Sequence, residues 1–353
     1  MIPDPLAAVM SWTKEIDGLK QAEQARRGMW LHASLPRPPI GTTPHTVIHR
    51  QNKLTVRHYG PSTGTPVIVV PSMINGAAIC DLEPDRSLVA GLALRGHAVY
   101  LIDWGTPGPE DAEQTVAFTL TTLLHRAIDR ACRHARSKTA FLLGYCQGGT
   151  LATMYTALRP ARIAGLAVFN APVKFSEAGR FARLVDPAVF DVNAAIPADR
   201  LMSTDVMKVA FKLLDPMGNF TKYLALEQIA QRPAALSRAL ARERWLEENV
   251  PMPGAFAQEF IRCAYQEDRL LAGTWTVDGT TIDLSTITAP LLVCAAARDF
   301  IAPAPSVLPL ADAVGSTDVT AKTLDTGHIG LIVGSFGPRV FYPLLSEWFG
   351  ARQ

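Results

Sequence analysis

The sequence predicts an α/β fold in which a mostly parallel sheet is covered by helices on both faces and carries a helical cap. Apolar runs of strand length recur along the chain, separated by stretches long enough for a helix. One of these runs leads into a glycine-flanked turn and then a helical stretch, "FLLGYCQGGTL". Between residues 175 and 270 the strand rhythm stops. The chain has 353 residues, 48% of them apolar, so one elaborated domain can bury a large core.

The first elements are expected to be a helix and a hairpin. Residues 1–40 combine a mixed polar and apolar stretch, typical of a surface helix, with the Pro-rich segment "LPRPPIGTTP". Residues 41–174 begin the core with "HTVIHRQNKLTVRHYG", a hairpin turning near Gln51 and Asn52, because β-branched residues alternate with polar ones on either side. The strands that follow are predicted at 66–72, 97–104, 139–146 and 163–172.

The rest of the chain is divided into a cap and the second part of the core. Residues 175–270 show helical patterns such as "MKVAFKLLDPM" and "AFAQEFIRCAYQEDRLL", which predict a helical cap (lid). Residues 271–353 return to the core with a short hairpin, "TWTVDGTTIDL", in which Asp278 and Gly279 supply the positive φ values of a tight turn. A strand at 289–296 and another at "DVTAKTL" then complete the sheet.

Composition and charge exclude several functional classes. The net charge is +2, with no block of like charges, which gives no support for nucleic-acid binding. Five widely spaced cysteines without a CxxC pair indicate neither a disulfide framework nor a metal site. The N-terminus resembles no signal peptide, and no run of about 18 apolar residues predicts a membrane span. We therefore expect a cytoplasmic, soluble protein.

Cys146 is the candidate nucleophile. It stands at the centre of a Gly-x-Cys-x-Gly turn, Gly144 to Gly148, between a strand and a helix, where strained backbone geometry pushes the central side chain outward. Serine usually occupies this position, whereas a thiol forms a thioester when it attacks an acyl group. A lone cysteine in an apolar chain is ordinarily a small buried hydrophobe, and we expect that role for Cys132, Cys263 and Cys294.

A nucleophile in such a turn needs a base and a group that orients the base, in the chain order nucleophile, acid, histidine. Asp299 follows the strand at 289–296, and His328 follows "DVTAKTL" in "LDTGHIGL". The alternative for Asp299 is that it only caps the helix beginning near Pro303 or Pro305. Asp103 also ends a strand, but it precedes the nucleophile, and we expect it to anchor the loop "WGTPGPED". The other seven histidines are expected to be surface or structural residues: His32, His45, His49, His58, His97, His125 and His134.

An oxyanion formed at Cys146 also needs backbone N–H donors. This kind of turn provides one donor from the residue after the nucleophile, Gln147. The second donor is expected from the loop after "PVIVV", at Met73 or Ile74. No metal and no cofactor is expected at this site.

With these residues in place, the chain resembles the polyhydroxyalkanoate synthases of the α/β-hydrolase superfamily. The matching segments are "CDLEPDRSLVAGLALRGHAVYLIDWGTPGPED", "GYCQGGT", "KVAFKLLDPMGNFTKYL", "ERWLEENVPMPGAFAQEFIRCAYQEDRLLAG" and "GHIGLIVG". The resemblance implies an α/β-hydrolase fold and transfer of (R)-3-hydroxyacyl groups, with 3-hydroxybutyryl-CoA as the expected donor, from coenzyme A onto a polyester through a thioester. Cys146, Asp299 and His328 match the family triad. The length is similar to the short, class III/IV-like catalytic subunits, which implies a separate helical partner subunit and leaves a homodimer open.

Two departures from the family pattern affect the expected activity. Gly76, Ala77 and Ala78 follow Asn75 where the family usually has a basic residue and an aromatic pair, and Phe300 stands where the acid is usually followed by His. These changes concern substrate range and efficiency and leave the triad intact. Two alternatives therefore stay open beside the synthase: a cysteine thioesterase or esterase of the same fold, and a catalytically silent homologue associated with polyester granules.

Overall fold

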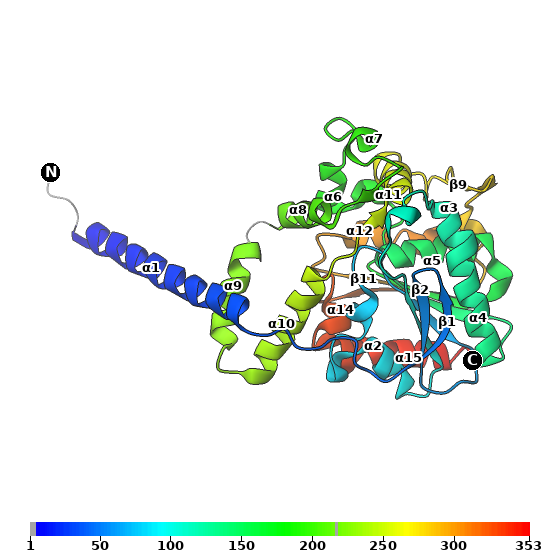
Figure 1. The fold of residues 1–353 in the computed structure, drawn as a ribbon, viewed down its shortest axis with the longest axis horizontal. Helices are drawn as coiled ribbons and strands as arrows, with labels where there is room; N and C mark the ends of the chain where they lie inside the picture. The colour runs from blue at the N-terminus through cyan, green and yellow to red at the C-terminus, as the bar shows by residue number, and fades with distance from the viewer. Residues whose placement is uncertain (1–4, 216–217) are drawn as a thin grey trace.

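An eight-stranded sheet forms the centre of the protein (Figure 1). The computed structural model describes residues 5–215 and 218–353, and the side chains of 17–215, 218 and 221–353. The strand order is β1-β2-β4-β3-β5-β6-β11-β12, in which β2 runs antiparallel to both of its neighbours and all other pairs are parallel. The strands are β1 (Thr46–Gln51), β2 (Leu54–Tyr59), β3 (Val67–Val70), β4 (Val99–Asp103), β5 (Ala140–Tyr145), β6 (Ile163–Phe169), β11 (Leu291–Ala296) and β12 (Val319–Leu324).

Helices cover both faces of this sheet, as the apolar strands predict. Every residue of β3 and of β11 is buried, because successive side chains alternate between two apolar layers. One layer packs against α4 (His125–Ala135) and α5 (Gln147–Leu158). The other packs against α2 (Leu88–Ala93) and α15 (Tyr342–Gly350). Outside the region between β6 and β11, four further α-helices near the sheet are short: α3 (Val116–Phe118), α12 (Ala304–Val307), α13 (Leu310–Ala313) and α14 (Gly330–Val333).

Both predicted hairpins form. In the first, Gln51 pairs with Leu54, so the central turn residues are Asn52 and Lys53, one position later than expected. Asn52 has φ of 51°, a conformation that Asn tolerates better than most residues. In the second hairpin, β9 (Thr276–Val277) and β10 (Thr280–Thr281) flank Asp278 and Gly279, which have φ values of 48° and 75°. These are the positive values that the sequence predicts for this turn.

The region between β6 and β11 is mostly helical and lies over the carboxyl ends of the parallel strands. The Ala255 N–H donates to the carbonyl of Ala112, in the loop after β4, at 3.1 Å. The Phe175 N–H, after β6, donates to Asp268 at 2.7 Å. Catalytic groups of such sheets lie at this edge. The helices and short strands of the region are α6 (Gly179–Leu184), α7 (Val192–Ala195), β7 (Leu201–Met202), α8 (Thr204–Leu214), α9 (Gly218–Ile229), α10 (Pro233–Glu247), β8 (Met252–Pro253) and α11 (Gly254–Phe260). The exact division of the chain at 40, 175 and 270 stays a prediction.

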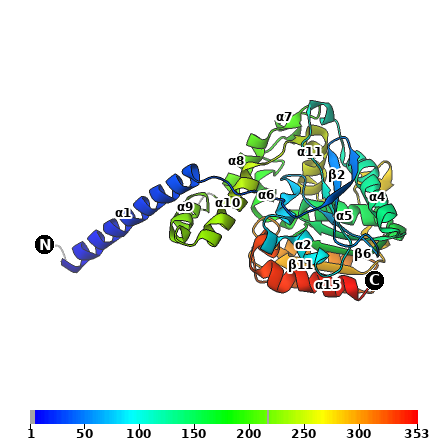
Figure 2. The ribbon, with the colours of Figure 1, turned by 60° about the horizontal axis from the view of Figure 1, so that its bottom comes forward.

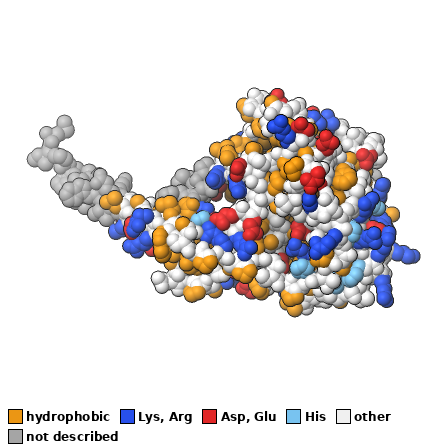
Figure 3. Space-filling view, in the orientation of Figure 1, with side chains coloured by type: hydrophobic (Ala, Val, Ile, Leu, Met, Phe, Trp, Pro, Cys, Tyr) orange, Lys and Arg blue, Asp and Glu red, His pale blue; other side chains and the backbone are white. Residues whose placement is uncertain are grey.

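The N-terminal helix α1 (Pro5–Ser34) projects away from the sheet in both ribbon views, and its last turns lie beside α9 (Figures 1 and 2). A buried carboxylate, Glu243 on α10, joins these helices by accepting from Lys222 at 2.7 Å and His32 at 3.2 Å. Hydrophobic side chains gather on the surface where α1 meets α9 and α10 (Figure 3). Trp30 is 63% exposed there. Within residues 5–215 and 218–353, no helix combines the length and hydrophobicity needed to cross a bilayer.

We expect Gly28→Ala to loosen the contact between α1 and α9, because a Cβ at Gly28 would collide with the backbone carbonyl of Tyr223. Hydrogen exchange should become faster in α1 and α9. Gly18→Ala is the matched control, since nothing lies within 4 Å of a Cβ at that position of the same helix. That change should stabilise α1 by about 1 kcal/mol. Equal protection of α1 in the two variants would contradict this account of the packing.

Candidate active site

The turn between β5 and α5 holds Cys146 in a strained conformation, with φ of 52° and ψ of −131°. Glycine is required around it because the helix lies directly against the strand. A Cβ at Gly144 would collide with the backbone of Gly149, and one at Gly148 would collide with the carbonyl oxygens of Val70 and Pro71. The Cys146 carbonyl accepts from the Gly149 N–H at 2.8 Å, which closes the first turn of α5. The cysteine side chain is partly exposed.

Asp299 and His328 come together beside Cys146, each in a loop that follows its strand. Asp299 Oδ2 and His328 Nδ1 are 2.6 Å apart, and His328 lies close enough to Cys146 for the charge of that side chain to act on the ring. Asp299 Oδ1 accepts from the N–H groups of Ile301 and Ala302 at 2.8 and 2.9 Å. These bonds lie in the turn before α12, which begins at Ala304 and has no side-chain cap, so the alternative that Asp299 only caps this helix is wrong. These backbone bonds fix the carboxylate that orients the imidazole.

Asn170, which the sequence analysis did not single out, holds the histidine loop in place. It lies at the end of β6, is fully buried and has φ of 49°. Its Nδ2 donates to the His328 carbonyl at 2.6 Å, and its Oδ1 accepts from the Ala296 N–H at 2.9 Å. Asn170 thereby ties the loop of the base to the strand that leads to the acid. An Asn directly after a buried strand is the only sequence signal for this role.

The charge state of His328 follows from its two partners. Burial of the ring lowers its pKa, but the negative charge at Cys146 and the hydrogen bonds that the ring donates to Asp299 and Cys146 together raise the pKa of His328 to about 10. The ring is then an imidazolium at neutral pH, which places a positive charge beside the nucleophile.

The three candidate oxyanion donors differ in their surroundings. Gln147 is the first residue of α5, so its backbone N–H has no partner within the helix. This N–H lies at the positive end of the helix dipole. The Met73 N–H donates to the side-chain Oε1 of Gln147 at 3.1 Å. The Ile74 N–H donates to Ser72 Oγ at 3.2 Å. The loop after β3 therefore lies on the turn as expected, but both of its candidate donors are already engaged by side chains.

Aromatic side chains of the cap pack against one another around Tyr265. Tyr265 lies close enough to Cys146 for the thiolate charge to raise the tyrosine pKa further, beyond the larger effect of burial. Its ring lies edge-on against Phe175 and Phe181, with centroids 4.8 Å away in each case. On the sheet side, the ring of Tyr145 lies 5.3 Å from that of His328. Neither tyrosine was predicted as a site residue, because aromatic residues in apolar segments are ordinarily expected in the hydrophobic core.

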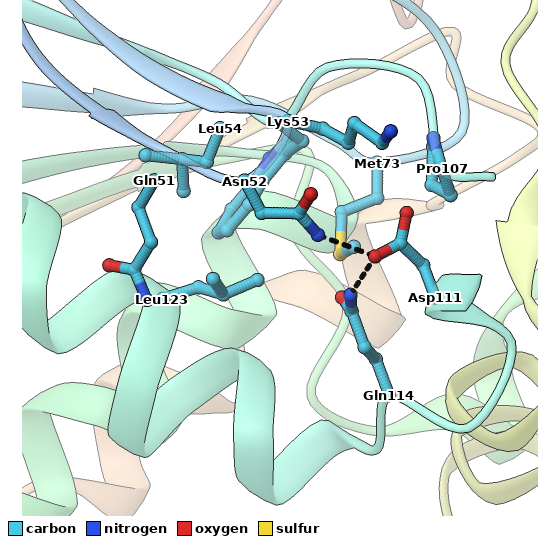
Figure 4. A pocket seen from close by; sticks show the side chains of 10 residues that line it. Gln51, Asn52, Lys53, Leu54, Met73, Pro107, Asp111, Gln114 and Leu123 are labelled. Carbon is cyan, nitrogen blue, oxygen red and sulfur yellow. Dashed lines mark hydrogen bonds between the residues drawn. The ribbon is translucent and has the colours of Figure 1, made fainter.

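A small pocket lies beside the Met73 loop, between the first hairpin and the loop after β4 (Figure 4). Its volume of about 20 Å³ leaves room for roughly one water molecule. Asp111, which is buried, accepts there from Asn52 and Gln114, each at 2.5 Å. Asp103 accepts from the Gly105 N–H at 3.1 Å and pairs with Arg57, which confirms its expected role as an anchor of this loop.

The residues that depart from the family pattern contact the cap. The carbonyl of Gly76 accepts from Trp245 Nε1, on α10, at 2.9 Å. Its neighbour Asn75 bonds to Asn249. Phe300 is 39% exposed and lies under the guanidinium of Arg180, on α6, at 5.7 Å from the ring centroid. Gly76 and Phe300 therefore contact the cap, and the triad itself is not altered.

Comparison with known proteins yields a family match and several relatives. Residues 65–335 match the α/β hydrolase fold family. The chain is 32% identical over 320 residues to the poly(3-hydroxyalkanoate) polymerase subunit PhaC of Haloferax mediterranei, covering 89% of this chain and 65% of that protein. It is 29% identical over 325 residues to the polymerase subunit PhaC of Synechocystis sp., covering 89% and 86%. The chain thus spans slightly less than two thirds of the Haloferax protein.

A solved structure supports the fold. The crystal structure of a hydrolase from Pseudomonas aeruginosa aligns with a TM-score of 0.55 and 18% identity, covering 88% of this chain and 99% of that one. At this level of identity, the likeness concerns the α/β-hydrolase fold alone.

We expect His328→Gln to slow alkylation of Cys146 by iodoacetamide at pH 7 by about tenfold or more, because the base beside the thiol is lost. The pKa of His328, about 10, lies above the ordinary value of 6.5, so the wild-type rate should show no step near pH 6.5. Alkylation rates measured across the pH range from about 5.5 to about 9 test this expectation. His125→Gln is the control, since that ring bonds Tyr155. A wild-type rate that changes with a midpoint near pH 6.5 would contradict the raised pKa of His328.

We expect Gly148→Ala to lower the free energy of unfolding by about 1–3 kcal/mol, because the added Cβ forces the loop after β3 away from the turn. Urea denaturation measures the loss. Gly76→Ala is the control, since nothing lies within 4 Å of a Cβ there and its φ of −58° suits alanine. A Gly148→Ala variant as stable as the control would show that the loop does not rest on the turn.

Proposed function

The chain belongs to the α/β-hydrolase family and is related to poly(3-hydroxyalkanoate) polymerases, and from this we propose that it is an acyltransferase that polymerises (R)-3-hydroxyacyl-CoA into polyester. The observation that carries the proposal is the cysteine at the strained turn, paired with His328 and Asp299. A thiol suits this chemistry because exchange of one thioester for another is nearly thermoneutral. The acyl group therefore keeps its reactivity for transfer to an alcohol.

The first half of the reaction transfers the acyl group to the enzyme. The Cys146 thiolate attacks the thioester carbonyl, and the oxyanion that forms is stabilised by the Gln147 N–H and by the dipole of α5. The carbon–sulfur bond to coenzyme A then breaks. The departing thiolate takes its proton from the His328 imidazolium, which leaves a neutral imidazole beside the Cys146 thioester.

The second half transfers the acyl group to a hydroxyl. The neutral His328, held by Asp299, accepts the proton as the 3-hydroxyl of another unit attacks the Cys146 thioester, and the cysteine leaves as thiolate. Water competes with this hydroxyl. The apolar aromatic cluster of Tyr265 and Phe175 supports the proposal, because apolar side chains in the cap offer water no hydrogen-bond partners. Entry of substrate requires the cap to move, and Gly179, with φ of 59°, stands at its first helix.

Partners and location follow from the same proposal. The donor is a hydroxyacyl-CoA, with 3-hydroxybutyryl-CoA as the simplest case, and the product is an insoluble chain, which would hold the enzyme at the surface of cytoplasmic granules. We propose a helical second subunit or a second copy of this chain as the protein partner. The projecting helix α1 supports such contacts, since its Leu19 and Trp30 are 72% and 63% exposed.

The proposal predicts the fate of the acyl group. Incubation with 3-hydroxybutyryl-CoA should release CoA, place an acyl adduct on the Cys146 peptide in mass spectrometry, and produce insoluble ester chains, with a helical partner subunit supplied in a parallel reaction. Cys146→Ala should abolish both CoA release and the adduct, whereas Cys132→Ala, a buried thiol remote from the turn, should retain both.

Two outcomes would point to the alternatives. Free 3-hydroxybutyrate in equal amount with CoA, in both reactions, would show that water is the acceptor and would favour the thioesterase. A folded protein that releases no CoA and forms no adduct in either reaction would instead indicate the catalytically silent homologue.

A further inference from the structure

Gln147 is involved in two of the three candidate oxyanion donors. Gln147 offers its own backbone N–H at the start of α5, and its side-chain Oε1 accepts from the Met73 N–H at 3.1 Å. Both residues are 6% exposed, so this bond is shielded from water. An N–H can only donate, and the carboxamide atom that faces it must therefore be the oxygen. A neutral carbonyl-like acceptor thus already occupies the second donor.

The loop that carries Met73 does not depend on this bond for its position. Trp104 Nε1 donates to the Pro71 carbonyl at 2.9 Å, and Trp245 Nε1 donates to the Gly76 carbonyl at 2.9 Å. The backbone of Gly148 rests on the carbonyl oxygens of Val70 and Pro71. These contacts hold the loop from both ends, on the sheet and on the cap. The position of the Met73 N–H is therefore set by these other contacts of the loop. The Gln147 side chain only supplies its hydrogen-bond acceptor.

We infer that the Gln147 side chain is a positioning residue that occupies the Met73 N–H in the resting enzyme and yields it to the oxyanion when Cys146 attacks an acyl thioester. The inference rests on the acylation step of the proposed function. A charged oxygen accepts a hydrogen bond about twice as strongly as a neutral one. The oxyanion consequently displaces the amide oxygen, whereas the neutral thioester carbonyl, which is a weaker acceptor than an amide, does not. The Met73 bond then contributes in the transition state and not in substrate binding.

This role and a purely structural role predict opposite changes in the acylation rate when the Gln147 side chain loses its acceptor. If Gln147 only supported the loop, any replacement of its side chain would slow acylation. If it occupies the donor, a side chain without an acceptor frees the Met73 N–H and speeds acylation, while a side chain with a stronger acceptor slows it. Gln147→Met has a similar length without an acceptor, and Gln147→Glu adds charge to the same oxygen.

The test is single-turnover acylation of Cys146 by 3-hydroxybutyryl-CoA in the full chain, with the half-saturating concentration and the limiting rate measured separately. For Gln147→Met we expect the limiting rate divided by the half-saturating concentration to rise by about three- to tenfold, the equivalent of one released hydrogen bond. Most of the gain should lie in a lower half-saturating concentration, because the neutral carbonyl can then use the Met73 N–H. For Gln147→Glu we expect a fall of about tenfold or more, because a carboxylate holds the donor more strongly and repels the oxyanion.

Two controls separate this inference from other effects. Alkylation of Cys146 by iodoacetamide forms no oxyanion, so its rate should be the same in Gln147→Met and the wild type. The Met73 amide should exchange its hydrogen faster in Gln147→Met in the absence of substrate. Gln147→Leu, which also lacks an acceptor, should repeat both results if the methionine variant does not fold.

The outcomes distinguish the inference from the proposed function. Slower acylation in the Met and Glu variants alike, with alkylation unchanged, would overturn the inference and leave the proposed function standing. Free acid in place of polymer from a wild type with normal acylation would overturn the polymerase and leave the inference standing. A wild type that no acyl-CoA acylates would overturn both.

Discussion

The positive φ at Cys146 determines how the nucleophile and its neighbours are arranged. A non-glycine residue in such a conformation costs about 1–3 kcal/mol, and it persists only where the surroundings leave no alternative. Here α5 packs so closely against β5 that Gly144 and Gly149 leave no room for a Cβ between them. The loop after β3 packs just as closely against Gly148. That close approach turns the thiol outward, leaves the Gln147 N–H free at the start of the helix, and places Met73 within reach. Relaxing the strain would therefore remove the nucleophile and its oxyanion donors together.

The base is placed by a second set of contacts, which tie together strands that are neighbours in the sheet. Asn170 at the end of β6 links Ala296, at the end of β11, to the carbonyl of His328, and Asp299 spans from its own loop to the imidazole. Because β6, β11 and β12 run parallel in that order, their carboxyl ends meet at one edge, and short polar side chains suffice to connect them. The register of the sheet thus sets the geometry of the triad.

Sequence reasoning reached the strands, both hairpins and the grouping of Cys146, Asp299 and His328, because each depends on local pattern: apolar runs, glycine at a positive φ, and polar residues at strand ends. It missed Asn170 and Tyr265. Their roles come from contacts with residues far away in the chain, and a single Asn or Tyr carries no periodic signal. The engagement of the Met73 N–H was missed for the same reason. Backbone donors can be assigned from a motif, but the side chain that occupies them depends on how the loop and the turn pack.

The resting site satisfies most of its polar groups internally, and this shapes how the chemistry can proceed. The carboxylate of Asp299 has three donors, the imidazole has two partners, and the Met73 N–H has the Gln147 amide. A buried polar group without a partner costs about 1–3 kcal/mol, so a site closed under an aromatic cover is stable only if its bonds are made within the protein. Substrate therefore meets a site in which the Met73 N–H is already hydrogen-bonded. It has to exchange bonds with the protein, and the exchange is favourable only where negative charge develops, at the oxygen that faces Gln147 and Met73. A site whose donors are mostly engaged in this way can accept an acyl group while giving water few free donors to bind.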